Sequence, residues 1–436
     1  MTTADKVTAT PGAISRDREA AKAWIDQARV DWDKGDVEGA ASCCRRALAL
    51  DASNVDALAN LGTLLWLEGR VEEGEARNFE AHAIDPGHLG AVLNLALLSH
   101  DAGDIETSLA WLRKAEKLRP GAADVIWRKG LLELALGDYA NGWKHYEAGA
   151  GLPHIRGRGP GFRTPPWRGE ACDRLVIWHE QGFGDTIQFV RYARLCRDRA
   201  NSVCVLCPPE LVRVLKTCPY VDAVFDAIDE GDFDQHVSIM SLPHLFGTTL
   251  QTIPAPIPYL HADPELVRRW SSRIRGNGLK VGLAWAGKLR EADLRYRVSD
   301  RRRNLSLRAM EPLLDLPGID FFSLQKGQPG SEAGGSRVHD FMDEVVDFAD
   351  TAAIVANLDL VISVDTSVVH LTGALGKPVW VLSRLDACWR WLRNRADSPW
   401  YPTARVFGQT LRGDWSTVIG AVRTELRGVT ASRTSS

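Results

Sequence analysis

The 436-residue sequence lacks any hydrophobic run of the length that a membrane-spanning helix needs. Its first twenty residues are polar, without the apolar segment of a secretory signal. A surplus of one charge is also missing, since 53 Lys and Arg stand against 56 Asp and Glu and leave a net charge of −3. The first absence disfavours a transmembrane protein. The near-neutral net charge disfavours a protein that binds nucleic acid through its overall positive charge. The length predicts about three domains.

The sequence also lacks a disulfide framework, because its eight cysteines have no regular spacing. Its Cys-x-x-Cys, Cys204 to Cys207, lies in an apolar segment that predicts a strand, where a period of two sends the two thiols to opposite faces. We therefore expect no metal site, no bound cofactor and a reduced, cytoplasmic protein.

Glycine recurs at a fixed interval in the first third of the sequence. Each of these glycines separates two helical patterns and stands 34 residues from the next: Gly35, Gly69, Gly103 and Gly137. The interval predicts four helix–turn–helix units, at residues 21–54, 55–88, 89–122 and 123–156. A period of 34 with this pattern resembles the tetratricopeptide repeat.

This resemblance implies an α-solenoid with a concave surface that binds a polypeptide or protein partner. A purely structural role, as a brace or a dimerisation surface, is the alternative. The tryptophans of the array are predicted to be core residues, and the end of the fourth unit, Trp143 to Tyr146, is predicted to pack on the next domain.

The rest of the sequence is divided by composition and by hydrophobic pattern. Residues 1–20 and 428–436 are predicted to be disordered tails, and residues 157–173, rich in glycine and proline, a linker that Trp167 fixes to a neighbour. Apolar strands that alternate with helical patterns then predict two α/β halves, at 174–275 and 276–427.

In the first half, the apolar strand Leu175 to Trp178 leads to a glycine-rich turn that ends in Gly182-Phe-Gly184-Asp185, with a helix predicted from Ile187 to Arg197. Gly182 and Gly184 let backbone N–H groups approach a ligand at the carboxyl end of a strand. Asp185 is either a functional carboxylate there or the N-cap of the helix.

In the second half, the strand Lys280 to Trp285 is followed by a predicted long loop to Asn304. The loop holds seven Lys and Arg against three acids, a local surplus that suits a diphosphate, or else a solvated basic loop or an RNA contact. A later strand ends at Gln325 and Lys326, which are further candidate nucleotide contacts.

The stretch Leu358 to Leu382 predicts strand, helix, strand, the crossover unit of a parallel sheet. Asp365, Thr366 and Ser367 stand where the strand ends and the helix begins, a position that favours anions, and His370 lies one turn further on. A capped helix with a packed histidine is the alternative. The aromatic segments 389–391 and 398–402 are predicted to line a sugar or acceptor site or to pack between domains.

The string Asp365-Thr-Ser-Val-Val-His370-Leu resembles the nucleotide-sugar-binding segment of the bacterial heptosyltransferases, glycosyltransferase family nine, with Ser367 where the family has Gly. Glu180 to Phe189 is similar to bacterial tetratricopeptide-repeat glycosyltransferase-like proteins. The resemblance implies two Rossmann-like halves in the B-type glycosyltransferase fold. The first half is then on the acceptor side and the second on the nucleotide-sugar side.

The resemblance further implies that Asp185 is the catalytic carboxylate, and that a Lys or Arg of the basic loop, best matched by Lys288 and Arg303, faces the leaving diphosphate. The function it implies is an inverting, metal-independent glycosyltransferase that uses a nucleotide-diphosphate sugar as co-substrate and a polypeptide acceptor held by the repeats. The alternative is a non-catalytic repeat scaffold with a degenerate nucleotide-sugar domain.

Overall fold

The structure is a computed structural model that describes residues 11–156, 159–254, 256–289 and 294–434. The chain forms two compact units. One consists of Met1–Val125 with Glu291–Val298, and the other consists of Ile126–Arg290 with Ser299–Ser436. Within the described ranges, no helix combines the length and the apolar character that crossing a bilayer requires.

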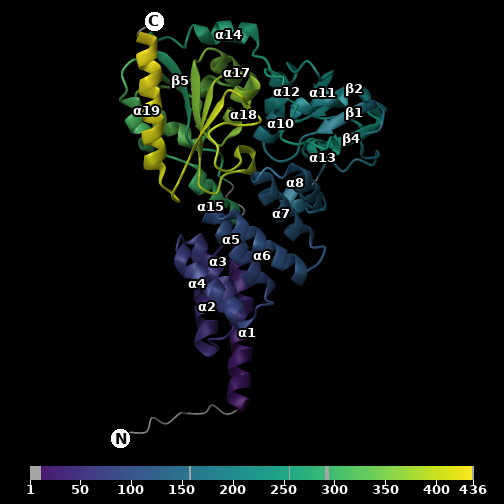
Figure 1. Cartoon of the computed structure of the whole chain (residues 1–436), viewed down its shortest axis with the longest axis vertical. Helices are drawn as coiled ribbons and strands as arrows, with labels where there is room; N and C mark the ends of the chain where they lie inside the picture. The colour runs from purple at the N-terminus through teal and green to yellow at the C-terminus, as the bar shows by residue number, and fades with distance from the viewer. Residues whose placement is uncertain (1–10, 157–158, 255, 290–293, 435–436) are drawn as a thin grey trace. The chain divides into compact units, whose positions relative to one another are not determined.

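The first unit is built from antiparallel helix pairs that follow the 34-residue period (Figure 1). Its helices are α1 (Pro11–Asp33), α2 (Val37–Leu50), α3 (Val55–Leu67), α4 (Val71–Ile84), α5 (Leu89–Asp101) and α6 (Ile105–Leu118), with α7 (Ala123–Ala135) across its boundary. The four periodic glycines lie in the left-handed region, with φ of 80°, 85°, 78° and 84°. Only glycine enters that region without strain, so the period marks the turns as predicted.

Both predicted tails are partly wrong. Helix α1 begins at Pro11, because proline suits the first turn of a helix and the residues after it are mostly good helix formers. The last helix, α19 (Trp415–Thr434), continues past Gly428, since Val429 extends its apolar stripe onto the core of the second sheet. Residues 1–10 and 435–436 lie outside the described residues.

The first sheet of the second unit is parallel, in the order β3-β2-β1-β4. Its strands are β1 (Cys172–Trp178), β2 (Ala200–Leu206), β3 (Ala223–Phe225) and β4 (Gln235–Ser238). The helices α10 (Phe183–Phe189), α11 (Ala193–Cys196), α12 (Pro209–Leu215) and α13 (Leu242–Leu245) accompany it. The segment 159–171 has neither helix nor strand, and Trp167 anchors it, buried, through a bond from its backbone N–H to His236 O (2.7 Å).

The second sheet is also parallel, in the order β10-β9-β8-β5-β6-β7. Its strands are β5 (Leu279–Ala284), β6 (Ile319–Ser323), β7 (Val338–His339), β8 (Leu360–Val364), β9 (Val379–Ser383) and β10 (Ala404–Gly408). Its helices are α14 (Pro264–Ser271), α16 (Glu311–Leu314), α17 (Phe348–Ala356), α18 (Ser367–Ala374) and α19. Helix α15 (Leu294–Arg303) belongs to the first unit up to Val298 and to the second unit from Ser299.

The long loop predicted from Ala286 to Asn304 is wrong over residues 294–303, which form α15. An i,i+3 ion pair between Asp300 and Arg303 (3.1 Å) supports the end of this helix. Arg290, Glu291 and Asp293 of the predicted basic loop lie outside the described residues.

The fourth repeat belongs to the same compact unit as the sheets. Its second helix, α8 (Tyr139–Tyr146), is followed by a 3-10 turn, η1 (Glu147–Gly151), and by α9 (Pro153–Arg156). Trp143 packs edge-on against Phe189 of α10 and Trp389 (ring centroids 5.9 and 5.0 Å apart). The predicted packing of the fourth unit on the next domain is therefore confirmed.

Candidate functional site

The turn between β1 and α10 places Asp185 within the first turn of the helix. Helix α10 starts at Phe183, four residues before the predicted Ile187, because the Asp185 side chain caps its start. Asp185 Oδ2 accepts a hydrogen bond from Gly182 N (2.8 Å), so the carboxylate sits at the third helical position and is not the N-cap. Its other oxygen, Oδ1, is directed away from this cap.

The turn between β8 and α18 holds the second predicted group. Thr366 is the N-cap of α18, but its hydroxyl pairs with Ser363 Oγ (3.1 Å) and makes no capping bond to the helix. Asp365 Oδ1 lies 4.0 Å from His370 Nε2. Among the described residues the Asp365 carboxylate accepts no hydrogen bond, and its side chain is 24% exposed.

His370 is buried between aromatic side chains. Its Nδ1 hydrogen-bonds with the Tyr401 hydroxyl (3.0 Å), and its ring stacks on Trp391 at a centroid distance of 5.7 Å. Burial, followed by the positive charges of Arg390 and Arg191, holds the pKa of His370 well below its usual value of 6.5. The imidazole is therefore neutral at neutral pH, and Nε2 faces Asp365.

The two turns meet directly, although they come from different sheets. Helix α10 packs against α18, and Figure 1 shows the two helices between the sheets. A Cβ at Gly184 would lie 2.6 Å from His370 Cδ2 and 3.4 Å from Ser367 Cα. Only glycine fits this approach. We call this contact of Gly182–Asp185 with Asp365–His370 the seam. It gathers seven of the predicted site residues: Gly182, Gly184, Asp185, Asp365, Thr366, Ser367 and His370.

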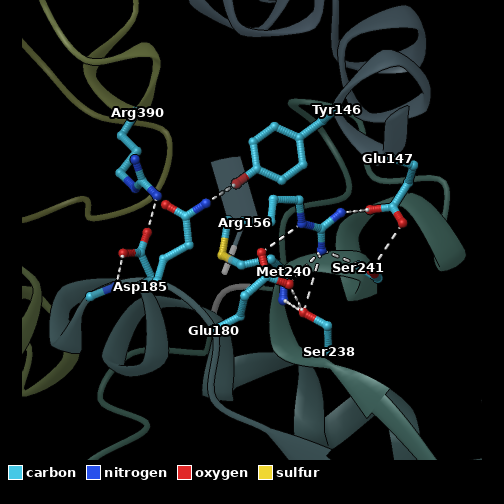
Figure 2. A network of polar contacts seen from close by, with 11 residues as sticks. Tyr146, Glu147, Arg156, Glu180, Asp185, Ser238, Met240, Ser241 and Arg390 are labelled. Carbon is cyan, nitrogen blue, oxygen red and sulfur yellow. Dashed lines mark hydrogen bonds and ion pairs between the residues drawn. The ribbon is translucent and has the colours of Figure 1, made fainter. Parts of the chain in front are cut away.

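Arg390 is a component of the seam that sequence reasoning missed. Its Nη2 pairs with Asp185 Oδ1, its Nε donates to Gln188 Oε1 (2.8 Å), and its guanidinium lies 4.2 Å from the centroid of the Trp389 ring. Figure 2 shows Arg390 pointing at Asp185. The available signal was a lone arginine between two tryptophans, in a segment noted for its aromatic rings alone.

Three of the four other predicted donor contacts gather at the end of β5, and the fourth, Lys326, follows β6 and lies elsewhere. Arg303 Nη2 donates to Lys288 O (3.3 Å), and Gln325 Oε1 accepts from the N–H groups of Trp285 and Ala286 (3.0 and 2.7 Å). Lys326, exposed, donates to Val345 O. Strands β5 and β8 are neighbours, with Ala284 opposite Ser363, so this group and Asp365 follow adjacent strand ends.

The two aromatic segments serve packing between the parts of this unit. Trp389 lies against Trp143 of α8. Trp400 Nε1 donates to the hydroxyl of Tyr139, also on α8 (2.9 Å). Arg191, fully buried, donates to Trp400 O (2.9 Å) and to the Tyr259 hydroxyl (2.9 Å). Of the two predicted roles, interdomain packing accounts for Trp389 and Trp400.

Comparison with known proteins identifies tetratricopeptide repeats in the N-terminal part of the chain, where a family model for this repeat matches residues 25–88. A curated relative, protein FlbA of Caulobacter vibrioides, is 30% identical over 333 residues, which cover 69% of this chain and 54% of FlbA. The chain thus spans about half the length of the curated relative that it matches.

Among solved structures, a mutant O-GlcNAc transferase of Thermobaculum terrenum is 15% identical, with a TM-score of 0.36, and the match covers 86% of this chain and 84% of that one. YrrB, described as a tetratricopeptide-repeat protein with an unusual peptide-binding site, is 18% identical with a TM-score of 0.27, over 33% of this chain and 74% of its own. The protein MamA is 20% identical with a TM-score of 0.27, over 31% of this chain and 74% of its own.

Proposed function

We propose that this protein is an inverting glycosyltransferase that transfers a sugar from a nucleotide-diphosphate donor to a polypeptide held by the repeats. In this proposal the two parallel sheets are the Rossmann-like halves of a B-type glycosyltransferase fold. The observation that carries it is the seam, where a carboxylate from one sheet meets an Asp, Thr and His group from the other. The sequence resemblance to heptosyltransferases falls on these same two turns.

The second sheet supports a donor site by its topology. From β5 the chain runs outward to β6 and β7, and then returns to the other side of β5 as β8, β9 and β10. Ligands of such sheets bind at the carboxyl ends of the strands where the direction reverses, which here are β5 and β8. Lys288 follows β5, while Asp365 and Thr366 follow β8, so cations and a helix N-terminus are available for a diphosphate.

In the proposed reaction, an acceptor oxygen attacks the anomeric carbon from the face opposite the diphosphate. The new C–O bond forms as the bond to the diphosphate oxygen breaks, and the acceptor proton passes to the Asp185 carboxylate as general base. Arg390 orients that carboxylate. Asp365 and neutral His370 hold sugar hydroxyls, and Lys288 with Arg303 stabilises the charge that builds on the leaving diphosphate.

Donor binding is tested first, with a panel of nucleotide-diphosphate sugars and the full-length chain. A donor that binds the folded state raises the melting temperature by mass action. For each donor found, Asp365→Ala and His370→Ala are expected to weaken binding by about 1–3 kcal/mol in calorimetry, because each leaves a polar partner without its contact. His261→Ala, an exposed histidine of the same unit, is the control. Unchanged affinity in both seam variants would remove the seam as the donor site.

The catalytic assignment is tested with Asp185→Asn. This variant keeps the size of the side chain and is expected to lower turnover by about 10²- to 10⁴-fold, the usual contribution of a general base, with donor affinity within a few-fold. Asp198→Asn, at an exposed aspartate of the same half, is the matched control. Near-normal turnover in Asp185→Asn would reduce Asp185 to a helix-capping residue.

Two contacts favour the second candidate, a repeat scaffold without catalysis. Asp185 is already paired with Arg390, and Gly184 is in close contact with His370. A protein that binds no member of the donor panel, yet retains a protein partner through its repeats, would fit this candidate.

A further inference from the structure

Glu180 and Gln181 connect β1 to the turn that carries Asp185, and residues at the end of the fourth repeat bind both of them. Figure 2 shows Arg156 beside Glu180. Arg156 donates to both carboxylate oxygens of Glu180, from Nε (2.6 Å) and from Nη2 (2.7 Å). Gln181 Nε2 donates to the Tyr146 hydroxyl (3.1 Å). Both residues that precede Gly182 are therefore fixed by the fourth repeat.

The Arg156–Glu180 pair is buried and fully engaged. Each residue is 4% exposed. Arg156 Nη1 also pairs with Glu147 (3.0 Å), and Ser238 at the end of β4 donates its hydroxyl to Glu180. A planar guanidinium on a carboxylate through two bonds fixes orientation as well as distance, which a packed apolar side chain would not do.

The backbone of this segment needs such support. Gln181 has a φ of 70°, a left-handed conformation that a side chain with a Cβ adopts only at a cost. At the far end of the same segment, Asp185 pairs with Arg390. Residues 180–185 are thus held by the fourth repeat at one end and by Arg390, in the segment after β9, at the other.

We propose that Tyr146 and Arg156 are positioning residues that set the conformation of the Gly182–Asp185 turn, so that the fourth repeat is a working part of the candidate active site. This inference rests on the proposed function for its catalytic meaning. Its structural content, that the fourth repeat controls the order of this turn, does not depend on any substrate.

Hydrogen exchange in the full-length chain tests the structural content. The N–H of Gly182 is bonded to Asp185 Oδ2, and the N–H of Asp185 to Gly182 O (3.1 Å), so a peptide over residues 179–186 reports the turn. Tyr146→Phe removes one hydroxyl and is expected to speed exchange in this peptide about two- to tenfold, the effect of one hydrogen bond. Tyr192→Phe is the matched control, because it removes another buried hydroxyl, bonded to Thr248 (2.8 Å), away from the turn.

Arg156 supplies a graded comparison. Arg156→Lys keeps the charge without the two-bond geometry, and Arg156→Met removes both. We expect exchange over 179–186 to rise in the order wild type, Lys, Met, with the Met variant more than about tenfold faster than wild type. Unchanged exchange in Tyr146→Phe, or acceleration spread evenly over the unit in every variant, would overturn the proposal.

The catalytic meaning is tested with any nucleotide-diphosphate sugar that wild type turns over. A positioning role predicts that Tyr146→Phe lowers kcat about two- to tenfold and leaves KM within twofold. A raised KM with unchanged kcat would overturn this role. If wild type turns over none of the sugars, the proposed function fails by itself, and the exchange result still decides whether the fourth repeat orders the turn.

Discussion

The two parallel sheets have the same topology and differ in the groups found at their reversal points, the pairs of neighbouring strands where the strand order changes direction. In each sheet the chain runs outward from the first strand and then returns to its other side, at β1 and β4 in one and at β5 and β8 in the other. At the first point, the Arg156 side chain lies against Glu180 and Ser238. At the second, the Asp365 carboxylate accepts no hydrogen bond from the described residues. The same topology thus holds the fourth repeat at one reversal point, while the proposed function assigns the polar groups at the other to the donor.

The largest expected effect concerns how deeply the fourth repeat is buried in the second unit. Tyr139, Trp143, Tyr146 and Arg156 are each at most 4% exposed within the second unit. Removing a large buried aromatic costs about 3–5 kcal/mol, so losing three exceeds the stability of many domains. We predict that a chain starting at Gly159 fails to fold, while one starting at Gly121, which keeps α7 and α8, unfolds cooperatively.

The thermal unfolding transition of both truncated chains is measured by far-UV circular dichroism. A cooperative transition in the chain that starts at Gly159 would show that the sheets fold without the fourth repeat. The attachment of this repeat at the first reversal point would then not be required for folding.

The next effect separates the ion pair from the packing around it. Arg156→Met or Glu180→Leu alone leaves one buried charge without its main partner and is expected to destabilise the second unit by about 3–5 kcal/mol. The double variant is expected to cost less than the sum, because neither charge is then left behind. Urea unfolding measures the three free energies, with Arg273→Met, at an exposed pair with Glu344, as the control. If the losses of unfolding free energy in the two single variants add up to the loss in the double variant, the two side chains do not stabilise each other as a pair.

Local signals in the sequence were sufficient for the framework of both units. The glycine period follows from turns that repeat the same left-handed conformation. Strands such as β8, Leu360–Val364, are apolar runs that a polar residue follows. The residues of the seam could be named because they follow strand ends, where ligands of parallel sheets bind.

The side-chain pairs around the Gly182–Asp185 turn could not be predicted, because their members come from different elements of the chain. Arg390 and Asp185 are 205 residues apart, and Arg156 and Glu180 belong to segments of different periodicity. No local pattern pairs a given arginine with a given acid. The helix boundary at Phe183 was missed for a related reason, since Asp185 caps the helix from its third position and the prediction offered it only the N-cap.

A smaller effect tests how close the seam is at the second reversal point. Gly184→Ala places a methyl group on the buried His370 ring and is expected to destabilise the unit by about 1–3 kcal/mol, the usual cost of overpacking, and to weaken donor binding. Gly420→Ala is the matched control, because it is also a helical glycine but has no atom within 4 Å of the added Cβ. It is expected to be neutral or stabilising. If Gly184→Ala and wild type are equally stable in urea, the contact between Gly184 and His370 can widen at no measurable cost.

The smallest effect distinguishes the two points by pH, because one is held by an ion pair and the other by a neutral histidine. The pKa of folded His370 lies well below the 6.5 of its unfolded state, chiefly through burial and then through Arg390 and Arg191. Below about pH 6.5 the unfolded chain therefore binds a proton that the folded chain excludes. The stability contribution of neutral His370 is complete above pH 6.5 and is lost as the pH falls toward the folded pKa, by up to about 1.4 kcal/mol per pH unit.

His370→Gln tests this contribution directly. Burial also lowers the pKa of His179 and of His236, so wild type is expected to lose stability between pH 6.5 and 5.5 through several groups. His370→Gln should be less stable than wild type at pH 8, yet lose less on acidification, because one excluded proton is removed from the balance. Urea midpoints at pH 8, 6.5 and 5.5 measure both slopes, and His261→Gln, at an exposed histidine, should follow wild type. If His370→Gln loses as much stability on acidification as wild type, the folded protein protonates His370 as readily as the unfolded chain does. The interior position of this ring would then impose no cost on its positive charge.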